Sequence, residues 1–193
     1  MCQPSTAASH FHLLRTHTYV NWHRPLVILT PKSMLRNKAA QSMPEEFTHG
    51  KWRPAIGDES ITDPSAVRTV LLCSGKFRWE LVAERARRGL EGQVAIVSLE
   101  RLYPLPTDNL AAELDRFRHV TDVRFVQDEP LNQGPWPFMA LHLPQAIEAA
   151  LPDYKLVMTP VARPEASSPS VGLLKVHQAQ EADLLERAFG TGE

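Results

Sequence analysis

The fold is decided by residues 125–138, Phe-Val-Gln-Asp-Glu-Pro-Leu-Asn-Gln-Gly-Pro-Trp-Pro-Phe. An apolar run typical of a β-strand ends there in two carboxylates, a proline, an amide pair and a glycine, which predicts a strand that runs into a loop. In α/β sheets, loops at the carboxyl ends of strands carry the polar groups of clefts and interfaces. We therefore expect four loop residues to face a subunit or domain interface: Asp128, Glu129, Asn132 and Gln133.

Strand and helix patterns alternate on both sides of this stretch. Strands are predicted over residues 24–31, 67–73, 94–99, 123–126 and 154–158, and helices over residues 77–88, 107–117, 138–150 and 175–189, the second of them capped by Thr107 and the first ended by Gly89. Such alternation predicts an α/β fold with a mostly parallel five-stranded sheet, right-handed crossovers and helices on both faces.

Composition excludes several classes of protein. The chain has 193 residues, 43% of them hydrophobic, which is enough for one full-sized core, and its net charge of -1 argues against a sequence-independent nucleic-acid binder. Its two cysteines, Cys2 and Cys73, argue against a disulfide framework and for a reducing compartment. No apolar run reaches the length of a membrane span, and no signal-peptide pattern opens the sequence. We expect a cytoplasmic protein without nucleic-acid or membrane partners.

Few residues have the spacing that catalysis or metal binding requires. The spacings of His10, His12 and His17 put no pair at i, i+4, so surface or packing roles are favoured over metal ligation. The turn Ser74-Gly75-Lys76 precedes a helix and could hold an anion, but it lacks the glycine spacing of a phosphate-binding loop. No His or Asp is placed to activate Cys73. We predict no catalytic, cofactor-binding or metal-ligating residue in this chain.

Several unusual sequence motifs of this chain occur together in one family. They are Phe11-His12-Leu13-Leu14-Arg15, residues 30–38 (Thr-Pro-Lys-Ser-Met-Leu-Arg-Asn-Lys), Cys73-Ser74-Gly75-Lys76, Glu100-Arg101-Leu102-Tyr103-Pro104, residues 125–138 and Val176-His177-Gln178. In order and spacing the chain resembles, from about Gln3 to Gly190, the C-terminal part of the first component of thiamine-diphosphate-dependent 2-oxoglutarate dehydrogenases. The motif over residues 33–38 is similar to the corresponding motif of the actinobacterial multifunctional 2-oxoglutarate metabolism enzymes.

The resemblance implies a role for the chain as a whole. It implies a transketolase-C-like domain over residues 25–193, with one antiparallel strand, preceded by a remnant of another domain over residues 1–24. In the family enzyme, an oxidoreductase and decarboxylase of the tricarboxylic acid cycle, thiamine diphosphate and magnesium bind to upstream domains. The chain is therefore expected to act in homo-dimer assembly, or with a full-length 2-oxoglutarate dehydrogenase subunit, and not to be catalytic alone. The alternative is a stand-alone paralogue that binds the full-length enzyme or a small anionic ligand.

The resemblance also implies an effector site for acetyl-CoA, as in actinobacterial members. Of its positions, Lys51 is kept and Arg101 replaces a glutamine, whereas arginines are replaced by Thr16, Asp108 and Asn109, and a serine by Pro54. Phosphate recognition rests on Arg and Lys donors, so the loss of three arginines predicts that the effector site is lost, with Lys51 and Arg101 as its weak remnant.

Overall fold

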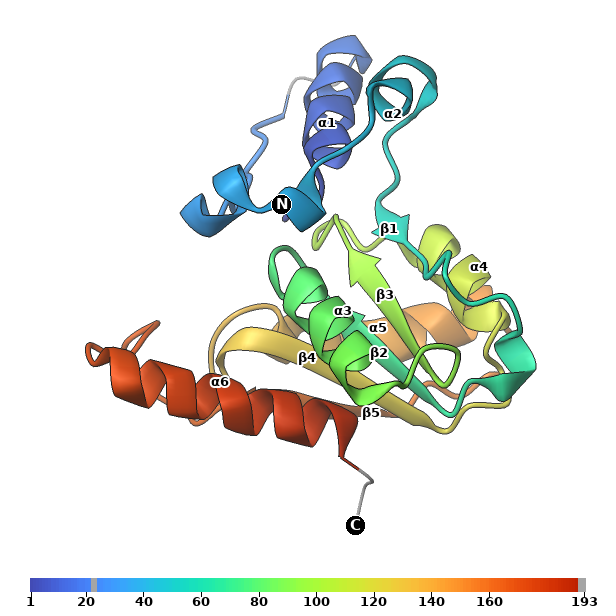
Figure 1. Ribbon diagram of the computed structural model, residues 1–193. Helices are drawn as coiled ribbons and strands as arrows, with labels where there is room; N and C mark the ends of the chain where they lie inside the picture. The colour runs from blue at the N-terminus through green and yellow to red at the C-terminus, as the bar shows by residue number, and fades with distance from the viewer. Residues whose placement is uncertain (22–23, 191–193) are drawn as a thin grey trace.

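The centre of the molecule is a sheet whose strands lie in the order β1-β3-β2-β4-β5. In this computed structural model, which describes residues 1–21 and 24–190, the strands are β1 (Ala55–Ile56), β2 (Thr69–Cys73), β3 (Val94–Leu99), β4 (Asp122–Pro130) and β5 (Met158–Arg163). β1 runs antiparallel to β3 and the remaining neighbours are parallel (Figure 1). The predicted fold class, a mostly parallel five-stranded sheet with one antiparallel strand, is confirmed.

Helices cover both faces of the sheet because the central strands place apolar side chains alternately on its two faces. On one face, α3 (Phe77–Arg88) and α6 (Leu174–Phe189) pack through Phe77, Leu81 and Leu184 against Leu71 and Cys73 of β2. On the other, α4 (Thr107–Asp115) and α5 (Trp136–Ala150) pack against a second set of core residues. That set includes Val70, Leu72, Val97, Phe125, Leu110, Leu114, Met139, Leu143 and Ile147.

A smaller layer lies over the carboxyl edge of the sheet (Figure 1). It holds α1 (Ala7–Tyr19), α2 (Pro44–His49) and two short 3₁₀ helices at Lys32–Arg36 and Lys38–Ala40, and a third 3₁₀ turn, Pro64–Ala66, precedes β2. Thr6 caps α1, since its hydroxyl oxygen accepts from Ser9 N at 3.0 Å. Within the described residues, no helix is both long and apolar enough to span a membrane.

Helix α3 begins and ends as its sequence predicts. Gly89 follows the last helical residue with φ of 65°, the left-handed conformation that glycine adopts without steric cost, and its N–H bonds the carbonyl of Ala86. At the helix start, however, the hydroxyl of Ser74 donates to Gln3 Oε1 at 2.7 Å instead of capping the helix.

Three predicted elements are corrected. Residues 24–31 form no strand of the sheet, because Ile28 makes only an isolated bridge with Cys2, and the fifth strand is instead the two-residue β1. The last strand begins at Met158 and not at residue 154. Thr107 is the first residue of α4, so it does not cap the helix, and Pro106 precedes it without a capping side chain. Residues 22–23 of the segment 1–24, and 191–193 of the domain 25–193, lie outside the described residues.

Candidate functional site

The carboxyl ends of β2, β4 and β5 meet at one charged cluster. Asp128 lies near the end of β4, and its Oδ1 accepts from Arg163 Nη2 at 2.6 Å at the end of β5. Its Oδ2 lies 2.8 Å from Nζ of Lys76, in the turn between β2 and α3. Asp128 therefore ties two strands and the start of a helix together.

Arg163 extends the cluster to α6. Its side chain is only 4% exposed, its Nε donates to Asp128 O at 2.7 Å, and its Nη1 donates to His177 O at 3.0 Å. A buried guanidinium is costly unless every donor finds a partner, and the carboxylate of Asp128 supplies the opposite charge. Arg163 acts as the hub that fixes β4, β5 and α6 at this edge.

Glu80 shares Lys76 with Asp128. Its Oε1 lies 3.0 Å from Lys76 Nζ, one helical turn away, while its Oε2 is buried without a hydrogen-bond partner. Burial raises the pKa of Glu80, and the nearby ammonium offsets the effect only in part. For Asp128, burial would raise the pKa, but hydrogen bonds from Lys76 and Arg163 outweigh it and lower that pKa overall.

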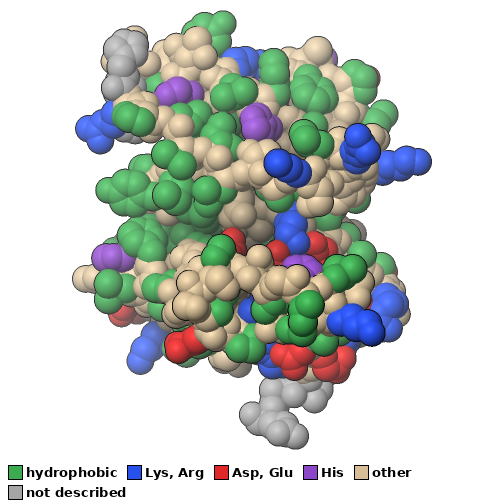
Figure 2. All heavy atoms as spheres, turned by 90° about the vertical axis from the view of Figure 1, so that its left-hand side faces the viewer, with side chains coloured by type: hydrophobic (Ala, Val, Ile, Leu, Met, Phe, Trp, Pro, Cys, Tyr) green, Lys and Arg blue, Asp and Glu red, His purple; other side chains and the backbone are tan. Residues whose placement is uncertain are grey.

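Glu129 differs from its neighbour in its environment. Burial raises the pKa of Glu129, and the negative charge of Asp128 raises it further. The pairing of β4 with β5 is irregular between Val126 and Pro130, and in this region both carboxylates line one groove of about 340 Å³. The groove is lined by Gln3, Leu29, Thr30, Pro31, Ser74, Lys76, Phe77, Gln127, Asp128 and Glu129. Figure 2 shows a hollow between the upper layer and the sheet, with acidic and basic side chains in it.

The predicted loop is partly strand. β4 continues through Asp128 and Glu129 to Pro130, so both carboxylates lie on the strand and not in a loop after it. The turn that follows is built on Gln127, which is 2% exposed: its Nε2 donates to Pro130 O and Gln133 O at 2.9 Å, and its Oε1 accepts from Trp136 N at 2.8 Å. Gly134 has φ of 66° there, and a Cβ at this position would lie 2.9 Å from Glu129 Cβ.

The amide pair binds the loop after β5. Asn132 Nδ2 donates to Ala166 O at 3.0 Å, its Oδ1 accepts from Ala166 N at 3.1 Å, and Gln133 Nε2 donates to Ala166 O at 2.7 Å. Asp128, Asn132 and Gln133 thus have partners inside the chain, and their contact with another subunit or domain stays a prediction.

The two residues predicted as effector remnants do not share a cavity. Lys51 lines a cavity of about 390 Å³ between α1, α2 and α3, together with Arg53, Arg78 and the buried His12. Arg101 does not line it: its Nε donates to Pro104 O at 2.9 Å, and its backbone bridges Cys2. The two cations therefore make no common anion site.

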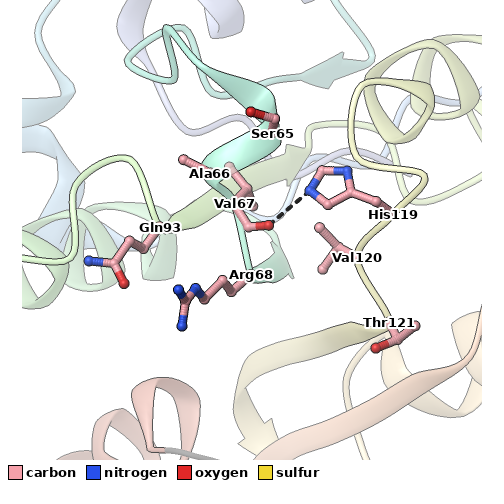
Figure 3. A pocket seen from close by; sticks show the side chains of 8 residues that line it. All are labelled: Ser65, Ala66, Val67, Arg68, Gln93, His119, Val120 and Thr121. Atoms are coloured by element: carbon pink, nitrogen blue, oxygen red, sulfur yellow. Dashed lines mark hydrogen bonds between the residues drawn. The ribbon is translucent and has the colours of Figure 1, made fainter.

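A third cavity, of about 480 Å³, lies at the opposite edge of the sheet (Figure 3). Its lining residues come from the segment before β2, the turn before β3 and the segment before β4. Among them, His119 Nε2 lies 3.0 Å from Val67 O, and Arg68 is the single arginine or lysine. None of the predicted site residues lies there.

The described residues were also compared with the chemistry that metal binding and nucleophilic catalysis require. Within residues 1–21 and 24–190, no group of three or more His, Cys, Asp or Glu could hold a metal ion. At the charged cluster, Asp128 is already neutralised by Lys76 and Arg163. Burial raises the pKa of Cys73 to about 12, which disfavours the thiolate that a nucleophilic cysteine needs.

Comparisons with known proteins place this architecture in a family. Residues 41–189 match the family model described as 2-oxoglutarate dehydrogenase C-terminal. The chain belongs to this family. The C-terminal domain is 46% identical over 190 residues to the 2-oxoglutarate dehydrogenase E1/E2 component of Corynebacterium glutamicum, and 42% identical over 194 residues to the multifunctional 2-oxoglutarate metabolism enzyme of Mycolicibacterium vanbaalenii. Each match covers 98% of this chain and 15% of the relative, so the domain spans a small part of the relatives' length.

A solved structure supports the fold. A chain described as "Split gene transketolase, inactive beta4 tetramer" superposes with a TM-score of 0.54 at 13% identity, over 97% of this domain and 56% of that chain. At this identity the likeness concerns the fold alone. The family resemblance and the transketolase-like fold inferred from the sequence are both confirmed.

Proposed function

We propose that this chain is a structural C-terminal domain of a 2-oxoglutarate dehydrogenase first component, which acts in dimer assembly and has no catalytic activity of its own. On this proposal thiamine diphosphate, magnesium and the 2-oxo acid bind to polypeptide outside residues 1–193. The partner is a second copy of the domain or a full-length subunit.

One observation carries the proposal: the carboxylate of Asp128, at the carboxyl edge of the sheet, is paired within the fold. Asp128 is bound by Lys76 and Arg163, and a general acid or base needs a proton that it can exchange with a substrate. Lowering the pKa of Asp128 keeps it ionised and paired, which suits a structural ion pair. The same edge exposes Asn132 and the loop around Ala166, where a partner could dock against a preorganised surface.

Activity and assembly are tested separately. The purified chain, given thiamine diphosphate, magnesium and 2-oxoglutarate, is expected to release no carbon dioxide, whereas the Corynebacterium glutamicum relative serves as the positive control. Turnover by the homogeneous chain would refute the absence of catalysis.

Assembly is measured by sedimentation equilibrium of the chain, alone and mixed with the full-length relative. A dimer, or a complex with the relative, is expected. A chain that stays monomeric at micromolar concentration and does not bind the relative would contradict the proposed role in assembly.

A further inference from the structure

The carboxylate of Glu129 has no cation to pair with. Together with Asp128 it lines the groove of about 340 Å³ at the carboxyl edge of the sheet. Asp128 is bound by Lys76 and Arg163, but in the part of the chain that the structure describes no cationic side chain forms an ion pair with Glu129. Its carboxylate accepts a hydrogen bond only from its own backbone N–H. One acceptor group that lines the groove therefore lacks a partner of opposite charge.

The charges around Glu129 leave an excess of one negative charge. Lys76 and Arg163 supply two positive charges. Three carboxylates face them when ionised, those of Asp128, Glu80 and Glu129. Burial raises the pKa of Glu129, and the charge of Asp128 raises it further, so the ionised carboxylate costs stability as long as it is unpaired. A carboxylate that opposes folding and lies in a cleft is typical of a binding site.

The turn after β4 fixes the side chain of Glu129 in its place. Gly134 has φ of 66°, and a Cβ at this position would lie 2.9 Å from Glu129 Cβ and 3.1 Å from Glu129 Cγ. The side chain of Glu129 thus packs against a backbone that only glycine leaves uncovered. Its carboxylate is held ready for a ligand, which lowers the entropy that binding would otherwise cost.

The rest of the groove combines apolar walls with a few polar groups. Leu29 and Pro31 line it on the side of the upper layer. Gln3 lies over the turn between β2 and α3, where a Cβ at Gly75 would be only 2.6 Å from Gln3 Cγ, and its Oε1 accepts from the hydroxyl of Ser74 at 2.7 Å. Apolar walls, few polar groups and a volume of about 340 Å³ are properties of a pocket for a small molecule.

We propose that this groove binds a small organic cation, a primary ammonium group on an apolar body, with the ammonium paired to Glu129 and the apolar body against Leu29 and Pro31. An ammonium group has three donors and no acceptor, so it matches a carboxylate that lacks donors. A metal ion suits the groove less well, because no group of three or more His, Cys, Asp or Glu within residues 1–21 and 24–190 could hold one. The inference goes beyond the proposed role in assembly and does not depend on it.

A charged probe and its neutral analogue test the inference. Benzylamine is protonated at neutral pH, and benzyl alcohol has nearly the same shape without the charge. Amide chemical shifts of the chain, measured by NMR, should change saturably with benzylamine at residues 29–30, 74–77 and 127–129, with a dissociation constant of about 1 mM or tighter. Benzyl alcohol should bind at least about tenfold more weakly, because it cannot pair with the carboxylate.

Matched variants assign the binding to one side chain. Glu129→Gln keeps the shape and removes the charge, and it should weaken benzylamine binding by a factor of about ten or more. Glu91→Gln, at an exposed turn, should leave the dissociation constant unchanged. The comparison of amine and alcohol is made on the unaltered chain, so the test stands even if a variant folds poorly.

Three results would overturn the inference. They are the absence of saturable shifts up to about 50 mM benzylamine, equal binding of amine and alcohol, and undiminished binding by a folded Glu129→Gln chain. Each of them would leave the proposed role in assembly intact, since neither oligomeric state nor activity enters the measurement. Shifts at the same residues on concentrating the chain without amine would assign Glu129 to a cation of a second copy, and would also overturn the inference.

Discussion

The carboxylate of Glu100, which has no exposed surface, accepts a hydrogen bond from the hydroxyl of Ser9 at 2.6 Å, 91 positions away in the sequence. The same carboxylate accepts from Ser5 N at 2.7 Å, from Ser5 Oγ at 2.6 Å and from Ser98 Oγ at 2.7 Å. Four donors thus surround one buried carboxylate and attach α1 to the end of β3.

Removing this carboxylate should destabilise the protein. Glu100→Met keeps the volume but leaves the N–H of Ser5 without a partner, so we expect a loss of about 2 to 3 kcal/mol in the free energy of unfolding, measured by urea denaturation. Glu100→Gln, which keeps one acceptor oxygen, should cost less. We call Glu100 and its four donors the Glu100 cage. A Glu100→Met protein as stable as the wild type would show that this cage contributes nothing to the free energy of unfolding.

Asp128→Ala should also destabilise the protein, because it leaves the buried guanidinium of Arg163 without its carboxylate. The expected loss is about 2 to 3 kcal/mol at neutral pH, from thermal or urea unfolding. Glu186→Ala, which removes a 70% exposed partner of Arg88, is the matched control and should cost less than about 1 kcal/mol.

The stabilisation that Asp128 contributes should decrease as the pH falls. The folded-state pKa of Asp128 is lowered, so its stabilisation is present above the unfolded-state pKa and is lost as the pH falls through that value toward the folded one. The difference between wild type and Asp128→Ala should therefore shrink on acidification below about pH 4. A difference that stays constant down to pH 2 would contradict this assignment.

Glu129→Gln should change the free energy of unfolding in the opposite direction and stabilise the protein at neutral pH. Burial raises the folded-state pKa of Glu129, so ionising this group costs stability as the pH rises above its ordinary value of 4.5. The amide carries no charge, so the variant should be more stable than wild type at pH 7 and equal to it at pH 3, in the same unfolding assay. Glu91→Gln, at an exposed turn, should show no such gain. A variant that is less stable at pH 7 would indicate that Glu129 has a partner that its ionised form needs.

The effector prediction can be tested by calorimetric titration with acetyl-CoA. We expect no binding at micromolar concentration, because three arginines are absent and Lys51 and Arg101 line no common cavity. In addition, Asp108 lies in the first turn of α4, where its carboxylate meets the positive end of the helix dipole that an anion would otherwise use. A micromolar dissociation constant that Lys51→Ala abolishes would show that the site survives in altered form.

The regular part of the fold could be predicted from apolar periodicity. α3 and β3 have their predicted bounds because Gly89 ends the helix and the strand is an unbroken apolar run. Residues 26–29 are also an apolar run, but Val27 and Leu29 are exposed, so this segment has no buried face that would favour its pairing in the sheet. The actual edge strand, β1, has two residues, too few for any period to show.

Only part of the candidate site could be predicted from the sequence. Asp128 was found because it follows a buried run, and Arg163 has the same signal, since it follows the buried Val161 and Ala162 at the end of β5. The sequence pattern predicts this strand over residues 154–158, so Arg163 falls outside the predicted strand. The contacts that decide the roles of Asp128 and Glu129 depend on which strands are neighbours, and sequence spacing does not contain that information.

The Glu100 cage also sets an order of events in folding. Its donors from Ser5 and Ser9 lie more than 90 positions from the acceptor, and closing so long a loop costs chain entropy that is recovered only when β3 is already in place. We therefore expect α1 to dock after the sheet has formed and to detach first when the native protein opens. Amide hydrogens of α1 should exchange by this partial opening, while those of β2 and β3 wait for global unfolding.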